Sequence, residues 1–270
     1  MRLLSLSILA LALRAEEPVS FPAIPAEQLR EWMSRSPAKN AERLTGLRTL
    51  FTEAGCPELR EQKVRGSKLP NLICRVPGET AETIVVGAHF DKVKAGRGVI
   101  DNWTGATLLA ALEFAMNGAK PKRTLLFVGF TDEELGLVGS RAFARQIPKA
   151  ELGNYRAMIN LDSLGAGPLV LWVSHADREL ANLAVRVAGK LGQKITGVNI
   201  ENVGDGDSSS FRQRKIPIID FHSLTQENFR LLHTDDDNES AFHADDFDRA
   251  YRFLVTYVGF LAHYWKPEAR

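Results

Sequence analysis

The chain has 270 residues, of which 44% are hydrophobic, and its formal net charge at pH 7 is +1. This length and apolar content suffice for one sizeable core, so we expect a single domain over residues 16–270 and a monomer by default. The near-zero net charge gives no electrostatic basis for binding nucleic acid or an anionic membrane, and we expect neither partner.

The first fifteen residues have the pattern of a secretory signal peptide. One early arginine precedes the apolar run Leu3–Leu13, and small residues follow it. The run is too short to span a bilayer, which needs about 20 residues. The pattern predicts cleavage after Ala15 and a secreted or periplasmic protein; the alternative is an ordinary N-terminal segment with a leucine-rich start.

Cys56 and Cys74 are the two cysteines of the chain. In an exported protein they are consistent with one disulfide, and equally with two buried thiols. Cys56 comes just after a helical pattern and Cys74 lies in a strand-like run, so the sequence alone does not bring them within bonding distance.

Predicted strands and helices alternate along most of the chain. The helices predicted from apolar spacing and flanking Gly or Pro are Pro25–Arg35, Ala41–Ala54, Thr107–Met116, Glu134–Gln146, Arg178–Leu191, Ser208–Arg214 and Asp246–Tyr264. The strands predicted from short apolar runs are Val64–Arg65, Leu72–Val76, Thr83–Ala88, Thr124–Phe130, Ala157–Leu161, Leu169–Val173 and Ile216–Phe221. This order predicts an α/β fold, a three-layer sandwich with a central, mostly parallel mixed β-sheet flanked by helices.

Acidic residues and histidines lie on the segments that follow four of these strands. They are His89, Asp91, Asp101, Glu133, Glu134, Asp162 and His233. Because the carboxyl ends of parallel strands meet at one edge of the sheet, where sites are built, we expect these side chains to gather there. So many carboxylates would repel one another unless cations neutralised them.

Histidine and carboxylate ligands together suit Zn²⁺, with Mn²⁺ or Co²⁺ as alternatives. The set exceeds what one tetrahedral zinc needs, and two metals about 3.5–4 Å apart that share a carboxylate would use it. The neighbouring Glu133 and Glu134 cannot easily point to the same atom, so one is expected to bind metal and the other to act as general base. The alternative is a solvated acidic turn at the start of a helix.

Six segments resemble a known family, the zinc-dependent aminopeptidases with two co-catalytic zincs, to which the glutaminyl cyclases are related. In the family's order they read GAHFD, IDNWTGA, TDEELGLVGSRAF, NLDSLG, DSSSFRQRKIPII and LHTDDD. The resemblance covers roughly Leu72–Tyr264. It implies a metal-dependent exopeptidase that removes N-terminal residues from peptides with a free N-terminus.

The resemblance also implies a role for each candidate residue. Its metal ligands would be His89 and Asp162 on one zinc, Glu134 and His233 on the other, and Asp101 bridging the two. Glu133 would be the general base. Asp91 would accept a hydrogen bond from His89 and fix the tautomer of that ring.

Departures from the family pattern keep two other hypotheses open. Ser208-Ser209-Ser210 stand before Phe211 where the family shows Ser-Asp-His, which affects substrate contacts rather than metal binding. The stretches from Leu161 and from His233 are more like those of glutaminyl cyclases. The alternative function is therefore a glutaminyl-peptide cyclotransferase with one zinc, which forms N-terminal pyroglutamate. A third hypothesis is a metal-stabilised binding module without catalysis.

Other polar or aromatic residues are not assigned as ligands or catalytic groups. For His222 we weigh a place in the pocket wall against an ordinary strand-end histidine and favour the second. We expect Asp207 to lie close to the site and Asp235–Asp237 to form a solvated acidic rim. Trp103 either walls the pocket or packs in the core, and His175 is expected to cap a turn.

Overall fold

A mixed eight-stranded sheet runs through the computed structural model, which describes residues 20–199 and 204–266. The strands are β1 (Glu58–Gln62), β2 (Asn71–Val76), β3 (Thr80–His89), β4 (Arg123–Phe130), β5 (Tyr155–Leu161), β6 (Val170–Trp172), β7 (Thr196–Val198) and β8 (Ile218–His222). Their spatial order is β1-β2-β4-β3-β5-β8-β6-β7. The central strands β4, β3, β5 and β8 are parallel, whereas β2 and β6 run antiparallel to their inner neighbours.

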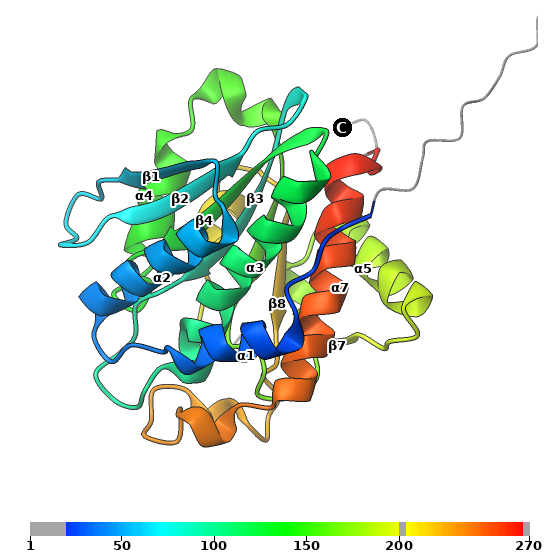
Figure 1. The fold of residues 1–270 in the computed structure, drawn as a ribbon. Helices are drawn as coiled ribbons and strands as arrows, with labels where there is room; N and C mark the ends of the chain where they lie inside the picture. The colour runs from blue at the N-terminus through cyan, green and yellow to red at the C-terminus, as the bar shows by residue number, and fades with distance from the viewer. Residues whose placement is uncertain (1–19, 200–203, 267–270) are drawn as a thin grey trace, which may run out of the picture.

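Helices cover both faces of the sheet. They are α1 (Ala26–Ser34), α2 (Asn40–Ala54), α3 (Thr104–Ala119), α4 (Val138–Gln146), α5 (Arg178–Lys190), α6 (Ser208–Arg212) and α7 (Ala244–His263). Figure 1 shows α1, α2, α3 and α7 together over one face. The other face packs on α4 and α6 through Phe143 and Phe211. The predicted three-layer α/β sandwich with a mostly parallel sheet is therefore confirmed.

The central strands are apolar on both sides because both sides are covered. In β3, Ile84 and Val86 pack in the larger core with α3 and α7, whereas Val85 between them packs in the smaller core with α4 and α6. The same alternation continues to His89, which shares the face of Val85. The last residue of β3 therefore points a histidine toward the α4–α6 side of the sheet.

Two predicted elements differ from the structure, and one observed strand was not predicted. The strand at Val64–Arg65 is wrong: the partner of β2 is β1, a polar edge strand with the sequence ELREQ. The helix predicted from Glu134 begins only at Val138, because Leu137 before it has a left-handed backbone with φ of 60°. The two glutamates therefore lie in a loop and not in a first helical turn. The short strand β7 was not predicted, since its residues are largely exposed.

Cys56 and Cys74 form a disulfide, with their Cα atoms 6.0 Å apart. It joins the segment after α2 to strand β2. Of the two alternatives that the sequence left open, the structure therefore has the disulfide and not two buried thiols. The predicted signal peptide, residues 1–15, lies outside the described residues, which begin at residue 20. Within the described ranges, no helix is both long and apolar enough to cross a membrane.

Candidate active site

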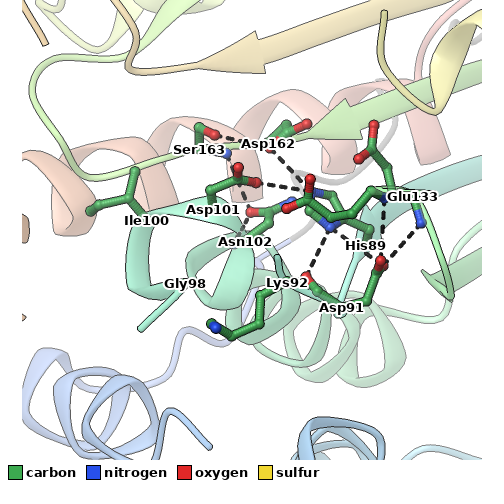
Figure 2. A network of polar contacts seen from close by, with 12 residues as sticks. His89, Asp91, Lys92, Gly98, Ile100, Asp101, Asn102, Glu133, Asp162 and Ser163 are labelled. Atoms are coloured by element: carbon green, nitrogen blue, oxygen red, sulfur yellow. Dashed lines mark hydrogen bonds and ion pairs between the residues drawn. The ribbon is translucent and has the colours of Figure 1, made fainter. Parts of the chain in front are cut away.

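The predicted site residues come together at the carboxyl ends of the central strands. His89 ends β3, Glu133 and Glu134 follow β4, and Asp162 follows β5. Figure 2 shows His89, Asp101 and Asp162 pointing toward one another. His89, Asp101 and Glu134 each offer one ligand atom, and these atoms lie within 4.8 Å of one another.

Asp101 lies between two histidines. Its Oδ1 atom is 3.1 Å from His89 Nε2, and its Oδ2 atom is 3.3 Å from His233 Nε2. Asp162 Oδ1 is 3.5 Å from His89 Nε2, and Glu134 Oε2 is 2.8 Å from His233 Nε2. The side chains thus form two histidine–carboxylate pairs with one carboxylate in common, the grouping that the resemblance implies.

Asp237 holds the main chain at Asp101. Its carboxylate accepts hydrogen bonds from the N–H groups of Ile100 at 2.7 Å and Asp101 at 3.2 Å. Asp237 is only 3% exposed, so its assignment to a solvated acidic rim is wrong. The peptide bond between Asp101 and Asn102 is cis. The Asn102 amide donates to the Leu161 carbonyl at 2.9 Å, which ties this segment to β5.

Asp91 holds the two neighbouring glutamates. Its carboxylate accepts the main-chain N–H of Glu133 at 3.1 Å and that of Glu134 at 3.2 Å. His89 Nδ1 lies 3.1 Å from the main-chain oxygen of Asp91 and 3.6 Å from its carboxylate. The predicted hydrogen bond from His89 therefore goes to the carbonyl of Asp91, while the carboxylate positions the loop after β4.

A buried arginine from α2 supports the segment between His89 and Asp101. The guanidinium of Arg43 donates to the carbonyls of Phe90 and Gly98, at the two ends of that segment. The same guanidinium lies over the Trp103 ring, 5.3 Å from its centroid. Trp103 is fully buried and its Nε1 donates to the Trp32 carbonyl, so its packed-core alternative holds.

The site concentrates negative charge in a buried place. Burial raises the pKa of Glu134 to about 7 and that of Glu133 well above its usual range. The hydrogen bond with Asp101 raises the pKa of His233 to about 9. Burial opposes a low pKa for Asp101, but the hydrogen bonds from His233 and His89 hold it below its usual range. Carboxylates and imidazoles here share protons that a cation would displace.

The donor set fits a divalent metal. Imidazole nitrogen with carboxylate oxygen is the combination that zinc sites use. The buried Oε1 atom of Glu134 has no hydrogen-bond partner among the described residues. A buried acceptor without a donor is costly unless something else binds it. A zinc ion beside Glu134 would satisfy this oxygen and offset the repulsion between the carboxylates.

A cavity of about 350 Å³ opens beside these residues. Asp101, Glu133, Glu134, Asp162 and His233 line one side of it. Its other side includes Trp172, Asp220 and His222, so the favoured interpretation of His222 as an ordinary strand-end residue is wrong. The His175 ring stacks on the Trp172 ring, with their centroids 3.6 Å apart. Asp207 is buried, and its negative charge raises the pKa of Glu133.

Fold and site together define a metal-dependent hydrolase, with a histidine–carboxylate cluster at the strand ends of an α/β sandwich. The chain belongs to peptidase family M28, whose model matches residues 71–258. Among curated proteins, it is 31% identical over 153 residues to leupeptin-inactivating enzyme 1 of Streptomyces exfoliatus, over 55% of this chain and 34% of that protein. A vacuolar membrane protease of Candida dubliniensis is 36% identical over 100 residues, 36% of this chain and 10% of that protein. The chain thus spans about a third or less of the length of these relatives.

Solved structures of similar fold include peptidases and a cyclase. A zinc aminopeptidase from Bacillus subtilis has a TM-score of 0.66 and 20% identity, over 74% of this chain and 52% of that chain. The Legionella pneumophila LapA aminopeptidase has a TM-score of 0.71 and 17% identity, over 93% and 79%. The Fimbriiglobus ruber glutaminyl cyclase has a TM-score of 0.69 and 17% identity, over 89% and 97%. At these identities the likenesses show the fold.

Proposed function

We propose that this chain is a zinc aminopeptidase that binds two metal ions and removes N-terminal residues from peptides with a free N-terminus. The observation that carries the proposal is the position of Asp101 between His89 and His233, with contacts of 3.1 and 3.3 Å. A carboxylate that contacts both histidines through separate oxygens is suited to bridge a metal pair. Membership of peptidase family M28 supports the hydrolytic class.

The two pairs of side chains supply the remaining ligands. His89 and Asp162 would hold one zinc, and Glu134 and His233 would hold the other. When bound, the zinc pair would lower the pKa of water and stabilise negative charge on the scissile carbonyl oxygen. Asp237 and Asp91 position the ligands without binding metal. Asp237 accepts a hydrogen bond from the main chain at Asp101, and Asp91 accepts hydrogen bonds from the main chain at the two glutamates.

Glu133 is the proposed general base. Both glutamates line the cavity, and the side chain of Glu134 also contacts His233, which assigns Glu134 to the metal and leaves Glu133 as the base. Asp91 accepts both main-chain N–H groups and so fixes the main chain that carries the two carboxylates. Glu133 would take a proton from the attacking water and then deliver a proton to the leaving amine. The cavity of about 350 Å³ beside it has the size of a small-ligand site, which suits one residue at a chain end.

One observation favours the alternative, a glutaminyl-peptide cyclotransferase with one zinc. The stretches that begin at Leu161 and at His233 are more like those of glutaminyl cyclases than those of the peptidases. In that reaction Glu133 would move a proton from the α-amine of an N-terminal glutamine to the departing ammonia. The same cavity would enclose the glutamine side chain.

The deciding experiment measures metal content of the purified protein together with its activity on leucyl and glutaminyl substrates. Near two zincs per chain, with release of free leucine that is lost in Glu133→Gln at unchanged metal content, would support the peptidase and the base. We expect Glu133→Gln to lower kcat by about a hundredfold or more. One zinc per chain with pyroglutamate as the sole product would establish the cyclase instead. Chelation that changes stability in a protein without either activity would favour a binding module.

A further inference from the structure

The cavity extends from the candidate metal ligands down one face of the β5–β8 pair. Asn160 of β5 lies opposite Asp220 of β8, and Asp162 and His222 each come two residues later. Alternate residues of a strand face the same side, so these four side chains project from one face. Two residues of strand cover about 7 Å, so Asp220 lies roughly that far from Asp162 along the sheet. All four line the cavity.

Asp220 is a buried carboxylate at this deeper end of the cavity. It is 4% exposed, its Oδ2 atom accepts a hydrogen bond from the Ser208 hydroxyl at 2.8 Å, and the Asn160 side chain is a second hydrogen-bond partner. The charges that act on it, from Asp162 and Asp205, are both negative, and within the described chain it forms no ion pair. Burial raises the pKa of Asp220 to about 7. A buried carboxylate without a cation is unfavourable, so this end of the cavity suits a positively charged occupant.

The neighbouring polar groups also suit a cation. The Oδ1 atom of Asn160 is buried and has no hydrogen-bond partner among the described residues, so it can accept from an N–H of the occupant. His222 Nδ1 accepts the main-chain N–H of Leu224 at 3.0 Å, and burial lowers the pKa of His222 to about 4. The imidazole is therefore neutral at pH 7 and does not repel a positive charge.

Part of the remaining wall is apolar, formed by Trp172, Phe221, Leu224 and Leu232. Arg141 of α4, Asp205 and Ser163 also line the cavity, and the charges that act on Asp220 come from the acids Asp162 and Asp205. Lysine and arginine carry a long hydrocarbon stem below the charge, and such stems pack along apolar surface. A basic side chain therefore matches the apolar part of the wall and the acidic end of the cavity.

We propose that the deeper end of the cavity binds the side chain of the substrate's N-terminal residue and selects lysine or arginine, with Asp220 as the counter-ion. This rests on the proposed aminopeptidase function, because it places the scissile bond at the candidate metal ligands and the side chain against β8.

The test compares lysyl, arginyl, leucyl and methionyl anilides on the zinc-loaded wild type and on Asp220→Asn. Because a buried group left unpaired discriminates strongly, we expect wild-type kcat/KM to be about tenfold or more higher for the basic substrates. Asp220→Asn keeps an acceptor for Ser208 and should lower kcat/KM for lysyl and arginyl substrates about tenfold, chiefly through KM. Leucyl and methionyl hydrolysis in the same variant is the internal control and should change less than about threefold.

A wild type that prefers leucine, or an equal loss on all four substrates, would overturn the inference while leaving the aminopeptidase function standing. If no anilide is hydrolysed, the proposed function fails, and the ligand preference of the cavity is then tested by binding. Calorimetry compares the affinity for L-lysine with that for L-norleucine, which has the same carbon chain without the ammonium. Tighter binding of lysine that is lost in Asp220→Asn supports the cavity assignment, and equal binding of the two amino acids rejects it.

Discussion

The Asp237 carboxylate accepts the main-chain N–H of Asp101 at 3.2 Å, across 136 residues of chain. A second contact joins the same segments, since the Arg97 N–H donates to the main-chain oxygen of Asp237 at 2.7 Å. The loop that carries His233 and the segment that carries Asp101 therefore hold each other in place. The positions of two predicted ligands from distant parts of the sequence, Asp101 and His233, therefore depend on Asp237, which is not itself a predicted ligand.

We predict that Asp237→Asn weakens zinc binding about 10- to 100-fold, because an amide nitrogen cannot accept the second main-chain N–H and the bridging carboxylate loses its position. Competition with a chromogenic chelator measures the affinity. Asp236→Asn is the matched control, since Asp236 is the exposed neighbour in the same loop. Equal affinities for the two variants would show that Asp237 does not position the site.

Removal of metal is predicted to lower thermal stability. Without cations the carboxylates of Asp101, Glu134 and Asp162 repel one another, and a ligand present at a thousand times its Kd stabilises a fold by about 4 kcal/mol. For a chain of this size we expect a fall in Tm of roughly 8 °C or more after treatment with EDTA. Asp101→Asn should show a much smaller response. A melting curve of the wild type that EDTA leaves unchanged would contradict the metal site.

The buried Glu113 is predicted to make the stability of the fold depend on pH. It lies in α3, is fully buried, and both its carboxylate oxygens are without a partner among the described residues. Burial raises its pKa to about 8 from the ordinary 4.5. Between these values the folded protein holds a proton that the unfolded chain has released, so stability falls as pH rises.

Glu113→Gln is predicted to remove this dependence, since the amide does not ionise. Relative to wild type, the variant should gain roughly 3 kcal/mol in free energy of unfolding between pH 5 and pH 8. Urea denaturation at both pH values measures the difference, and Glu151→Gln, an exposed carboxylate, serves as control. A difference between Glu113→Gln and wild type that is the same at both pH values would contradict the assignment.

The disulfide between Cys56 and Cys74 is predicted to stabilise the fold by about 3 kcal/mol, because it closes a short loop in the unfolded chain. The two residues are 18 apart in sequence. Replacing both by alanine should shift the urea midpoint downward without changing zinc affinity, since the disulfide joins the segment after α2 to β2 and not the site loops. Unchanged midpoints, or a loss of zinc binding at full stability, would contradict this.

The central fold was predictable because buried parallel strands leave a strong apolar pattern. Strand β5 and its following Asp162, for example, are evident from the run of residues 157–161 and the acid directly after it. The edge strand β1 was not, because a half-exposed edge needs no apolar period. The start of α4 was misplaced because acids commonly open helices, and here Gly136 and Leu137 adopt left-handed backbone conformations instead.

The supporting residues of the site were harder to predict than its candidate ligands. Histidines and acids at strand ends indicate a metal site by type and place alone. The supporting role of Asp237 and the role proposed for Asp220 both depend on burial of the side chain, which is set by how distant segments pack. A run of three acids such as 235–237 ordinarily indicates a solvated surface, and nothing in the sequence sets its last member apart.

Arg43 connects helix α2 to the segment that carries Asp101. It donates to the carbonyls of Phe90 and Gly98, and it comes from α2, upstream of the matched family region at residues 71–258. A fragment trimmed to that region would keep all seven predicted site residues and lose the guanidinium that supports the segment leading to Asp101. The structural support of the site therefore extends upstream of the region of sequence similarity, to α2 at least.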